Sequence, residues 1–96
     1  MIVSFGDSLT EAFFHGGPAK KYRQLPPEIL RAARQKLDML NSARDLKDLL
    51  SPPGNRLELL KGDLKGLYSV RINDRWRIVF HWQGADAHDV QITDYH

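Results

Sequence analysis

The sequence predicts an α+β domain in which N-terminal helices pack on one face of an antiparallel sheet. From residue 56 onward, short runs rich in β-branched and aromatic residues alternate with Gly, Asn and Asp, which is typical of strands joined by tight turns. Before residue 56, apolar residues recur at helical spacing, so this half of the chain is expected to cover the buried side of the sheet. We expect residues 1–96 to form a single domain.

The most regular strand pattern lies in residues 75–82. Residues alternate across a strand, so one face is predicted to carry Trp76, Ile78, Phe80 and Trp82, and the other to carry Arg75, Arg77, Val79 and His81. The preceding Asn73-Asp74 favours a two-residue hairpin turn. The sheet is therefore expected to bury aromatic side chains on one side and to present cations on the other.

Three helices and a short strand are expected before the sheet. Residues 2–5 form the strand candidate, and Ser8-Leu9-Thr10-Glu11 matches a capping box that opens a short helix ending at Phe14. Pro26-Pro27 is suited to the start of a longer helix. Its apolar stripe is predicted to consist of Leu30, Ala33, Leu37 and Leu40. Residues 43–50 predict a third helix, with Leu46, Leu49 and Leu50 facing inward.

Composition limits the classes of function that remain. At 42% hydrophobic and 27% charged residues, the chain has the composition of a globular protein. It contains no cysteine, which rules out disulfides and cysteine-based zinc sites, and its histidines have no spacing typical of a metal site. We expect neither a metal nor another cofactor. No segment has the length and apolar character of a membrane span, so a cytoplasmic protein is expected.

Positive charge is concentrated in two segments although the net charge is only +2. Residues 20–36 contain six Lys and Arg residues against one acidic residue, and residues 56–81 contain six against three. This distribution indicates either a polyanionic or acidic partner, or a solvated helix face and cross-strand charge pairs.

One short motif points to a different activity and is rejected. Gly6-Asp7-Ser8-Leu9 spells the nucleophile block of the GDSL esterases and lipases, whose serine is activated by an Asp-x-x-His pair near the C-terminus. This chain has Asp94-Tyr95-His96 there, which is one residue too close, and it lacks the length for the crossover helices of a parallel sheet. Ser8 acting as a helix cap explains the block without catalysis.

The C-terminal half carries a second set of short blocks with a consistent order and spacing. These blocks are Lys61-Gly62-Asp63, Gly66, Ser69-Val70, Ile72-Asn73-Asp74, Trp76-Arg77-Ile78 and Asp94-Tyr95-His96. In combination they resemble the HigB-type toxins of the RelE/ParE superfamily of bacterial toxin–antitoxin systems. The resemblance implies a RelE/ParE-like fold and an mRNA interferase, an endoribonuclease that cuts mRNA in the ribosome. It also implies a HigA-type helix-turn-helix antitoxin that binds the toxin in a hetero-oligomer.

The chemistry of RNA cleavage suits the residues in these blocks. Attack by the RNA 2′-hydroxyl on the adjacent phosphorus needs a base, an acid for the leaving oxygen, and cations at the phosphate. A histidine side chain titrates near neutrality, so His96 is the candidate acid or base. Tyr95 can bind the phosphate or stack on a nucleobase. Asp94 can orient the site or accept a proton. The candidate phosphate-binding cations are Lys61, Arg71, Arg75 and Arg77.

The chain departs from the family pattern at one position. HigB sequences commonly read His-Pro-Leu-Lys-Gly-Asp where this chain reads Glu58-Leu59-Leu60-Lys61-Gly62-Asp63, so Glu58 stands in place of a histidine. A carboxylate is a competent base, but its usual pKa of about 4.3 makes it a poor acid at neutral pH. The division of roles between Glu58 and His96 therefore stays open. Two alternatives also stay open: a ParE-like inhibitor of DNA gyrase, and an antitoxin-binding module with weak or no catalysis.

Overall fold

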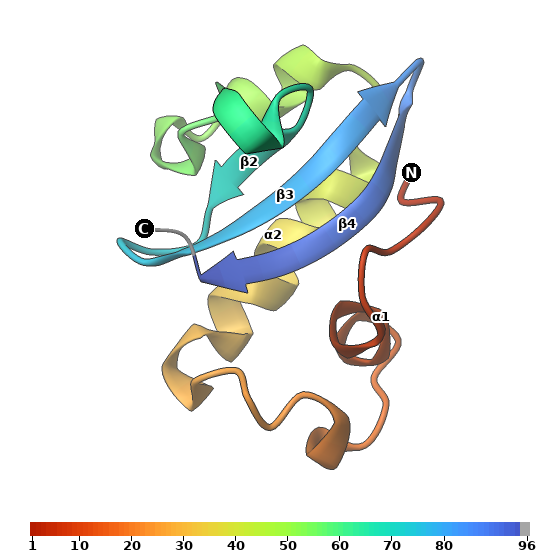
Figure 1. Ribbon diagram of the computed structural model, residues 1–96, viewed down its shortest axis with the longest axis vertical. Coiled ribbons are helices and arrows are strands. Elements are labelled where there is room, and N and C mark those ends of the chain that lie inside the picture. Colours follow the sequence, from red (N-terminus) through yellow and green to blue (C-terminus); the bar gives the residue numbers. More distant parts are fainter. Residues whose placement is uncertain (95–96) are drawn as a thin grey trace.

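The structure is a computed structural model that describes residues 1–94, and it contains an antiparallel sheet with helices against it (Figure 1). The strands follow the order β1 (Glu58–Leu59), β2 (Tyr68–Arg71), β3 (Trp76–Gln83) and β4 (Asp86–Asp94). Each strand pairs antiparallel with its neighbour. The predicted α+β class is confirmed, and the antiparallel pairing agrees with the rejection of a GDSL hydrolase, which needs a parallel sheet.

Helix α2 (Leu30–Ser42) supplies most of the helical side of the core. It lies behind β3 and β4 in the view of Figure 1 and contacts both strands. Ala33, Leu37 and Leu40 of the predicted stripe are buried. The two prolines lead into a 3₁₀ turn (Pro27–Ile29) rather than directly into the α-helix, and Ile29 of this turn is buried whereas Leu30 is only half-buried.

Helix α1 (Ser8–Phe14) is present as predicted, but the residue that caps it is different. The cap is Asp7, whose Oδ1 accepts a hydrogen bond from the Thr10 backbone N–H at 2.8 Å, so the capping box built on Ser8 was wrong. Asp7 is as good a cap as Ser, and it stands one position earlier. The buried Thr10 then fixes α1 to β4, because its Oγ1 accepts from the Ile92 N–H at 3.0 Å.

Residues 43–50 form a 3₁₀ helix (Leu46–Leu50) rather than an α-helix. Side chains three positions apart superpose along a 3₁₀ helix, which lets Leu46 and Leu49 face the core together. Leu50 falls outside that register and is 61% exposed, so its predicted inward orientation was wrong. Shorter 3₁₀ turns occur at Ala19–Lys21, Pro53–Asn55 and Gly62–Leu64.

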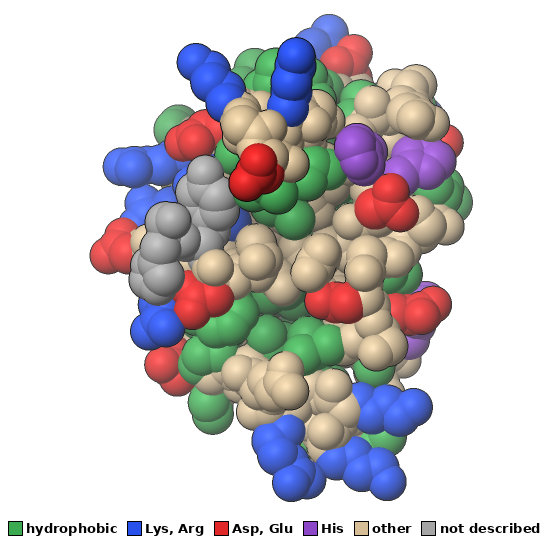
Figure 2. Space-filling view, in the orientation of Figure 1, with side chains coloured by type: hydrophobic (Ala, Val, Ile, Leu, Met, Phe, Trp, Pro, Cys, Tyr) green, Lys and Arg blue, Asp and Glu red, His purple; other side chains and the backbone are tan. Residues whose placement is uncertain are grey.

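The two faces of the sheet differ as the alternation of β3 predicted, but Arg77 and Val79 on the face opposite α2 are more buried than expected. Ile78 and Phe80 are fully buried in the core on the α2 side, with Trp76 and Trp82 packed against them. The opposite face is viewed in Figure 2. Val79 on this face is buried although it lies outside the main core cluster.

The connection between β2 and β3 is longer than the two-residue turn that was predicted. It comprises residues 72–75, and the Asn73 Oδ1 accepts from the Arg75 N–H at 2.9 Å and from the Trp76 N–H at 2.8 Å. This side-chain-capped turn replaces the backbone turn because an Asn side chain readily bonds the backbone two residues ahead. The turn sets the position of Arg75 at the start of β3.

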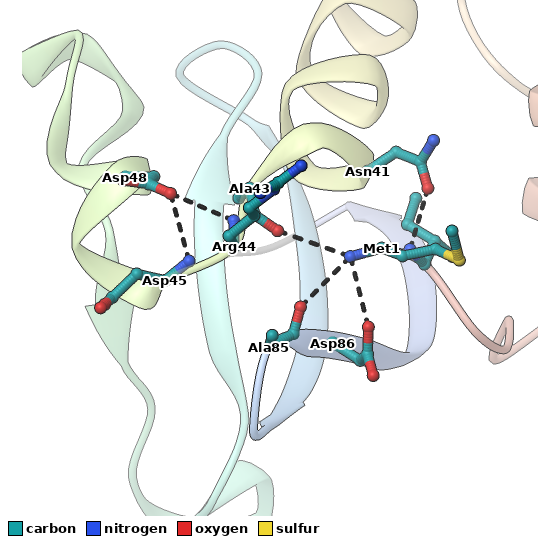
Figure 3. A network of polar contacts seen from close by, with 9 residues as sticks. Met1, Asn41, Ala43, Arg44, Asp45, Asp48, Ala85 and Asp86 are labelled. Atoms are coloured by element: carbon teal, nitrogen blue, oxygen red, sulfur yellow. Dashed lines mark hydrogen bonds and ion pairs between the residues drawn. The ribbon is translucent and has the colours of Figure 1, made fainter.

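The N-terminal segment runs alongside β4 without forming a regular strand. Ile2 and Phe5 make isolated parallel bridges to Ala87 and Val90, so the strand predicted for residues 2–5 is reduced to these contacts. Figure 3 shows the Met1 ammonium donating to the backbone oxygens of Ala43 and Ala85 at 3.4 and 3.2 Å. The segment thereby covers an edge of the sheet that would otherwise be open. Within residues 1–94, no helix is long and apolar enough to cross a membrane.

Candidate functional site

Two arginines lie side by side on the sheet face that α2 leaves uncovered. Arg71 of β2 and Arg77 of β3 are direct cross-strand partners, and Thr93 of β4 is the partner of Arg77 on its other side. Directly opposed residues share a face, and like charges in this position destabilise a sheet. Figure 2 shows Lys and Arg side chains with acidic side chains between them at this edge, where Figure 1 places the β2–β3 turn. The fold therefore gathers positive charge here at a cost in stability.

Arg77 is held in place by several protein groups. Its side chain is only 12% exposed, Nε donates to the Ser69 Oγ at 2.8 Å, and Nη2 donates to the Arg56 backbone oxygen at 2.8 Å. The Glu58 Oε1 lies 3.8 Å from the same Nη2. Ser69, fully buried on β2, was not identified from the sequence as part of the site, although its position opposite Val79 placed it on this face. Arg77 is thus a fixed guanidinium and not a mobile surface cation.

Each of the other two arginines is paired with a carboxylate. Arg71 forms a surface ion pair with Asp74 in the β2–β3 turn. Arg75 binds Asp94 in a bidentate arrangement, with Nε 3.0 Å from each carboxylate oxygen and Nη2 2.8 Å from Oδ2. The hydrogen bond from Arg75 to Asp94, together with the negative charge of Asp94, raises the pKa of Arg75. Arg75 therefore joins the start of β3 to the end of β4, a contact that the sequence did not reveal.

The remaining predicted residues lie around this arrangement. Glu58, half-exposed on β1, is the cross-strand partner of Ser69 and stands beside Arg77. Lys61 is exposed and precedes the Gly62–Leu64 turn that follows β1. Tyr95 and His96 lie outside the described residues, immediately after Asp94. The structure thus brings Glu58 and Arg71 next to Arg77.

Three surface hollows of the described chain lie away from these residues. One is lined by Ser8, Glu11, His15 and Lys21, and a second by Met1, Arg44 and Asp86. A third is lined mainly by apolar residues between 19 and 30. None of these three hollows is lined by Glu58, Arg71 or Arg77. Within residues 1–94, no three His, Asp or Glu side chains are grouped so as to hold a metal ion.

Comparison with known proteins identifies the family. Residues 3–96 match the model of the HigB-like toxins, described as RelE-like toxins of the type II toxin–antitoxin system HigB. The chain belongs to this family. The resemblance found in the sequence is therefore confirmed, and the match covers the candidate site together with the residues beyond position 94.

Curated relatives of this HigB-like toxin support the assignment. The chain is 40% identical over 82 residues to "Toxin HigB-1" of Vibrio cholerae, a match that covers 85% of this chain and 84% of the relative. It is 27% identical over 96 residues to "Endoribonuclease HigB" of Proteus vulgaris, and both chains are covered completely.

Solved structures share the fold at lower sequence identity. The toxin–antitoxin complex YoeB–YefM from Staphylococcus aureus contains a chain that matches with a TM-score of 0.60 and 20% identity, over 100% of this chain and 98% of that one. A "YoeB/ParE toxin" from Agrobacterium tumefaciens matches with a TM-score of 0.56 and 16% identity, over 99% and 98% of the two chains. These likenesses establish the RelE-type fold of this toxin.

The contacts of Arg77 generate a prediction about stability. Arg77→Lys removes a planar guanidinium that bonds two groups at once, so we expect it to lower the free energy of unfolding by about 1–3 kcal/mol. Arg71→Lys is the matched control, because its ion pair is with the fully solvated Asp74 and should cost less than about 1 kcal/mol. Urea unfolding of the two variants measures both values. Equal stabilities would show that the bonds of Arg77 do not hold the sheet face together.

Proposed function

We propose that this toxin is an endoribonuclease that cleaves mRNA and so inhibits translation. The observation that carries the proposal is the cross-strand pair of Arg71 and Arg77. Thr93 of β4 lies directly opposite Arg77 and is followed in the chain by Asp94-Tyr95-His96. Two guanidiniums held on adjacent strands suit the negatively charged oxygens of a phosphate. The relative from Proteus vulgaris is named an endoribonuclease, and family membership makes the same activity the natural expectation for this chain.

The reaction we propose uses the 2′-hydroxyl of the RNA as the nucleophile. A base removes the 2′-hydroxyl proton, the 2′-oxygen bonds to the adjacent phosphorus, and the bond from phosphorus to the 5′-oxygen breaks. An acid gives a proton to the departing 5′-oxygen, so the products are a 2′,3′-cyclic phosphate and a 5′-hydroxyl. Negative charge accumulates on the phosphoryl oxygens in this step, and fixed cations stabilise it. No metal ion is required by this route.

Arg77 is the cation best placed for that task. Its guanidinium is already oriented by Ser69 and Arg56, so little further conformational entropy is lost when the transition state forms. Arg71 adds a second positive charge from the adjacent strand, and the exposed Lys61 a third from the turn after β1. Glu58 stands next to Arg77 and is our candidate base, with His96 as the acid and Tyr95 in contact with the phosphate or a nucleobase.

We assign Arg75 a different role from the one its sequence position indicated. Because Asp94 occupies its guanidinium in a bidentate pair, Arg75 acts as a positioning residue that holds the end of β4 against the start of β3. The residues that follow Asp94 are the candidate catalytic ones. A fixed Asp94 therefore gives Tyr95 and His96 a defined point of attachment.

Family membership supports a proposal about the partner and the cellular setting. A type II toxin is restrained by an antitoxin, and we propose a HigA-type helix-turn-helix protein as the partner in a toxin–antitoxin hetero-oligomer. The neighbour of known structure from Staphylococcus aureus is itself a complex of a toxin with its antitoxin. We place the activity in the cytoplasm, on mRNA engaged by the ribosome.

The chemistry of the products tests the proposed reaction. We expect cleavage to survive EDTA, apart from the magnesium that ribosomes need, and to leave a 2′,3′-cyclic phosphate and a 5′-hydroxyl. An mRNA with a 2′-deoxynucleotide at the mapped cleavage position should resist cutting. Primer extension and end-group analysis measure both, beside a gyrase supercoiling assay. A 3′-hydroxyl with a 5′-phosphate would mean that water is the nucleophile, and gyrase inhibition without RNA cleavage would refute the proposal.

The roles of His96 and Glu58 are tested by two variants. If His96 transfers a proton, deleting it should slow cleavage by about 10²-fold or more. Glu58→Gln keeps the shape of the side chain but removes the base, and we expect a smaller loss because the acid and the phosphate-binding cations stay in place. Single-turnover rates on ribosome-bound mRNA provide the comparison, with thermal melts to verify folding. A folded protein that lacks His96 and cuts at the normal rate would contradict the assignment.

A further inference from the structure

An apolar groove lies on a part of the molecule that the proposed cleavage reaction does not use. It is formed by residues 19–30, has a volume of about 280 Å³, and its apolar walls come from Tyr22, Leu25, Pro27 and Leu30. Leu25 is 4% exposed, and the Tyr22 ring stands edge-on to Phe13 with ring centres 5.0 Å apart. The walls are therefore anchored in the core, and the groove exists before any partner binds.

Cations border this groove and have no acidic partner within the described chain. Lys20 and Arg23 line it, Lys21 adjoins it, and all three are exposed. None of them forms an ion pair with another residue of 1–94, whereas Arg71, Arg75 and Arg77 each have a carboxylate partner. Figure 2 shows Lys and Arg side chains gathered at the lower end of the molecule, where Figure 1 places this segment. The positive charge at the groove is thus available to an external partner.

The shape and chemistry of the groove favour a protein segment over other ligands. Its volume lies at the lower limit of the range of about 300–1,000 Å³ typical of small-molecule pockets. Single-stranded nucleic acids bind basic grooves whose aromatic side chains stack on successive bases, but here Tyr22 is the one aromatic among aliphatic walls. An amphipathic segment whose apolar side chains enter the groove while its Asp and Glu residues meet the rim fits both features.

We propose that this groove is the docking site for an acidic, amphipathic segment of the antitoxin. The inference rests on the proposed function only in taking an antitoxin as the partner. Apolar contact in the groove supplies affinity, and the unpaired cations steer the acidic segment and fix its orientation. The groove is formed by residues 19–30, whereas Arg71, Arg77 and Glu58 belong to the sheet, so a contact here is separable by mutation from RNA cleavage.

The test compares charge reversal at the groove with the same reversal elsewhere. The double variant Lys20→Glu/Arg23→Glu reverses the rim, and Arg44→Glu/Lys47→Glu is the matched control on exposed residues outside the groove. The probe is the purified protein encoded by the adjacent open reading frame, titrated by calorimetry at two salt concentrations. We expect the rim variant to bind the probe about tenfold or more weakly, and its affinity to depend much less on salt concentration. The affinity of the control should change by less than about threefold.

A second variant and a second readout make the outcomes distinct. Leu30→Gln should also weaken antitoxin binding, because it makes one apolar wall of the groove polar. All variants should cleave mRNA at the normal rate because none alters the sheet face.

Unchanged antitoxin binding by the rim variant would refute the groove as the docking site while leaving the toxin–antitoxin assignment intact. Loss of cleavage with normal antitoxin binding would mean that the groove serves RNA. A toxin dimer that only the rim variant disrupts would mean that a second copy fills it. Failure of the unaltered toxin to bind the probe would refute the antitoxin partner and this inference together.

Discussion

The arrangement of the sheet face depends on the bonds made by one arginine. Arg77 joins β3 to the buried Ser69 of β2 and to the backbone just before β1, and it stands beside Glu58. β1 has only two residues, so its own ladder with β2 contributes few hydrogen bonds. A guanidinium with several donors in a fixed plane compensates for this short strand, and a lysine has no equivalent geometry.

The same bonds explain how the chain tolerates arginines opposite each other. Arg71 and Arg77 repel across the strands, but each has a carboxylate close by, in Asp74 and Glu58 respectively. These carboxylates offset part of the repulsion between the two guanidiniums. A phosphate that approaches Arg77 would meet an oriented donor, and most of the cost of ordering it would already have been met during folding.

Sequence reasoning succeeded where the signal was periodic and failed where it depended on distant contacts. The alternation of Trp76, Ile78 and Phe80 correctly identified the core face of β3. The position of Leu50 was wrong because a 3₁₀ helix has a different period from the α-helix that was assumed. The pairing of Arg75 with Asp94 spans 19 positions of sequence and leaves no local pattern, so Arg75 was grouped with the phosphate-binding cations. Glu58 was singled out because the family pattern has a histidine at this position, and its place beside Arg77 became apparent only in the structure.

Salt dependence of RNA binding is the most direct test of the claim that Arg71, beside Arg77, contacts an RNA phosphate. A single-stranded, fully 2′-O-methylated RNA cannot be cut by the proposed reaction, so its affinity can be measured with the unaltered toxin. Each phosphate contact contributes about −0.7 to the slope of log K against log salt concentration for single strands. We predict that Arg71→Gln reduces the magnitude of the slope by about that amount and that the exposed Arg44→Gln leaves it unchanged. Equal slopes for the unaltered toxin and Arg71→Gln would contradict the account.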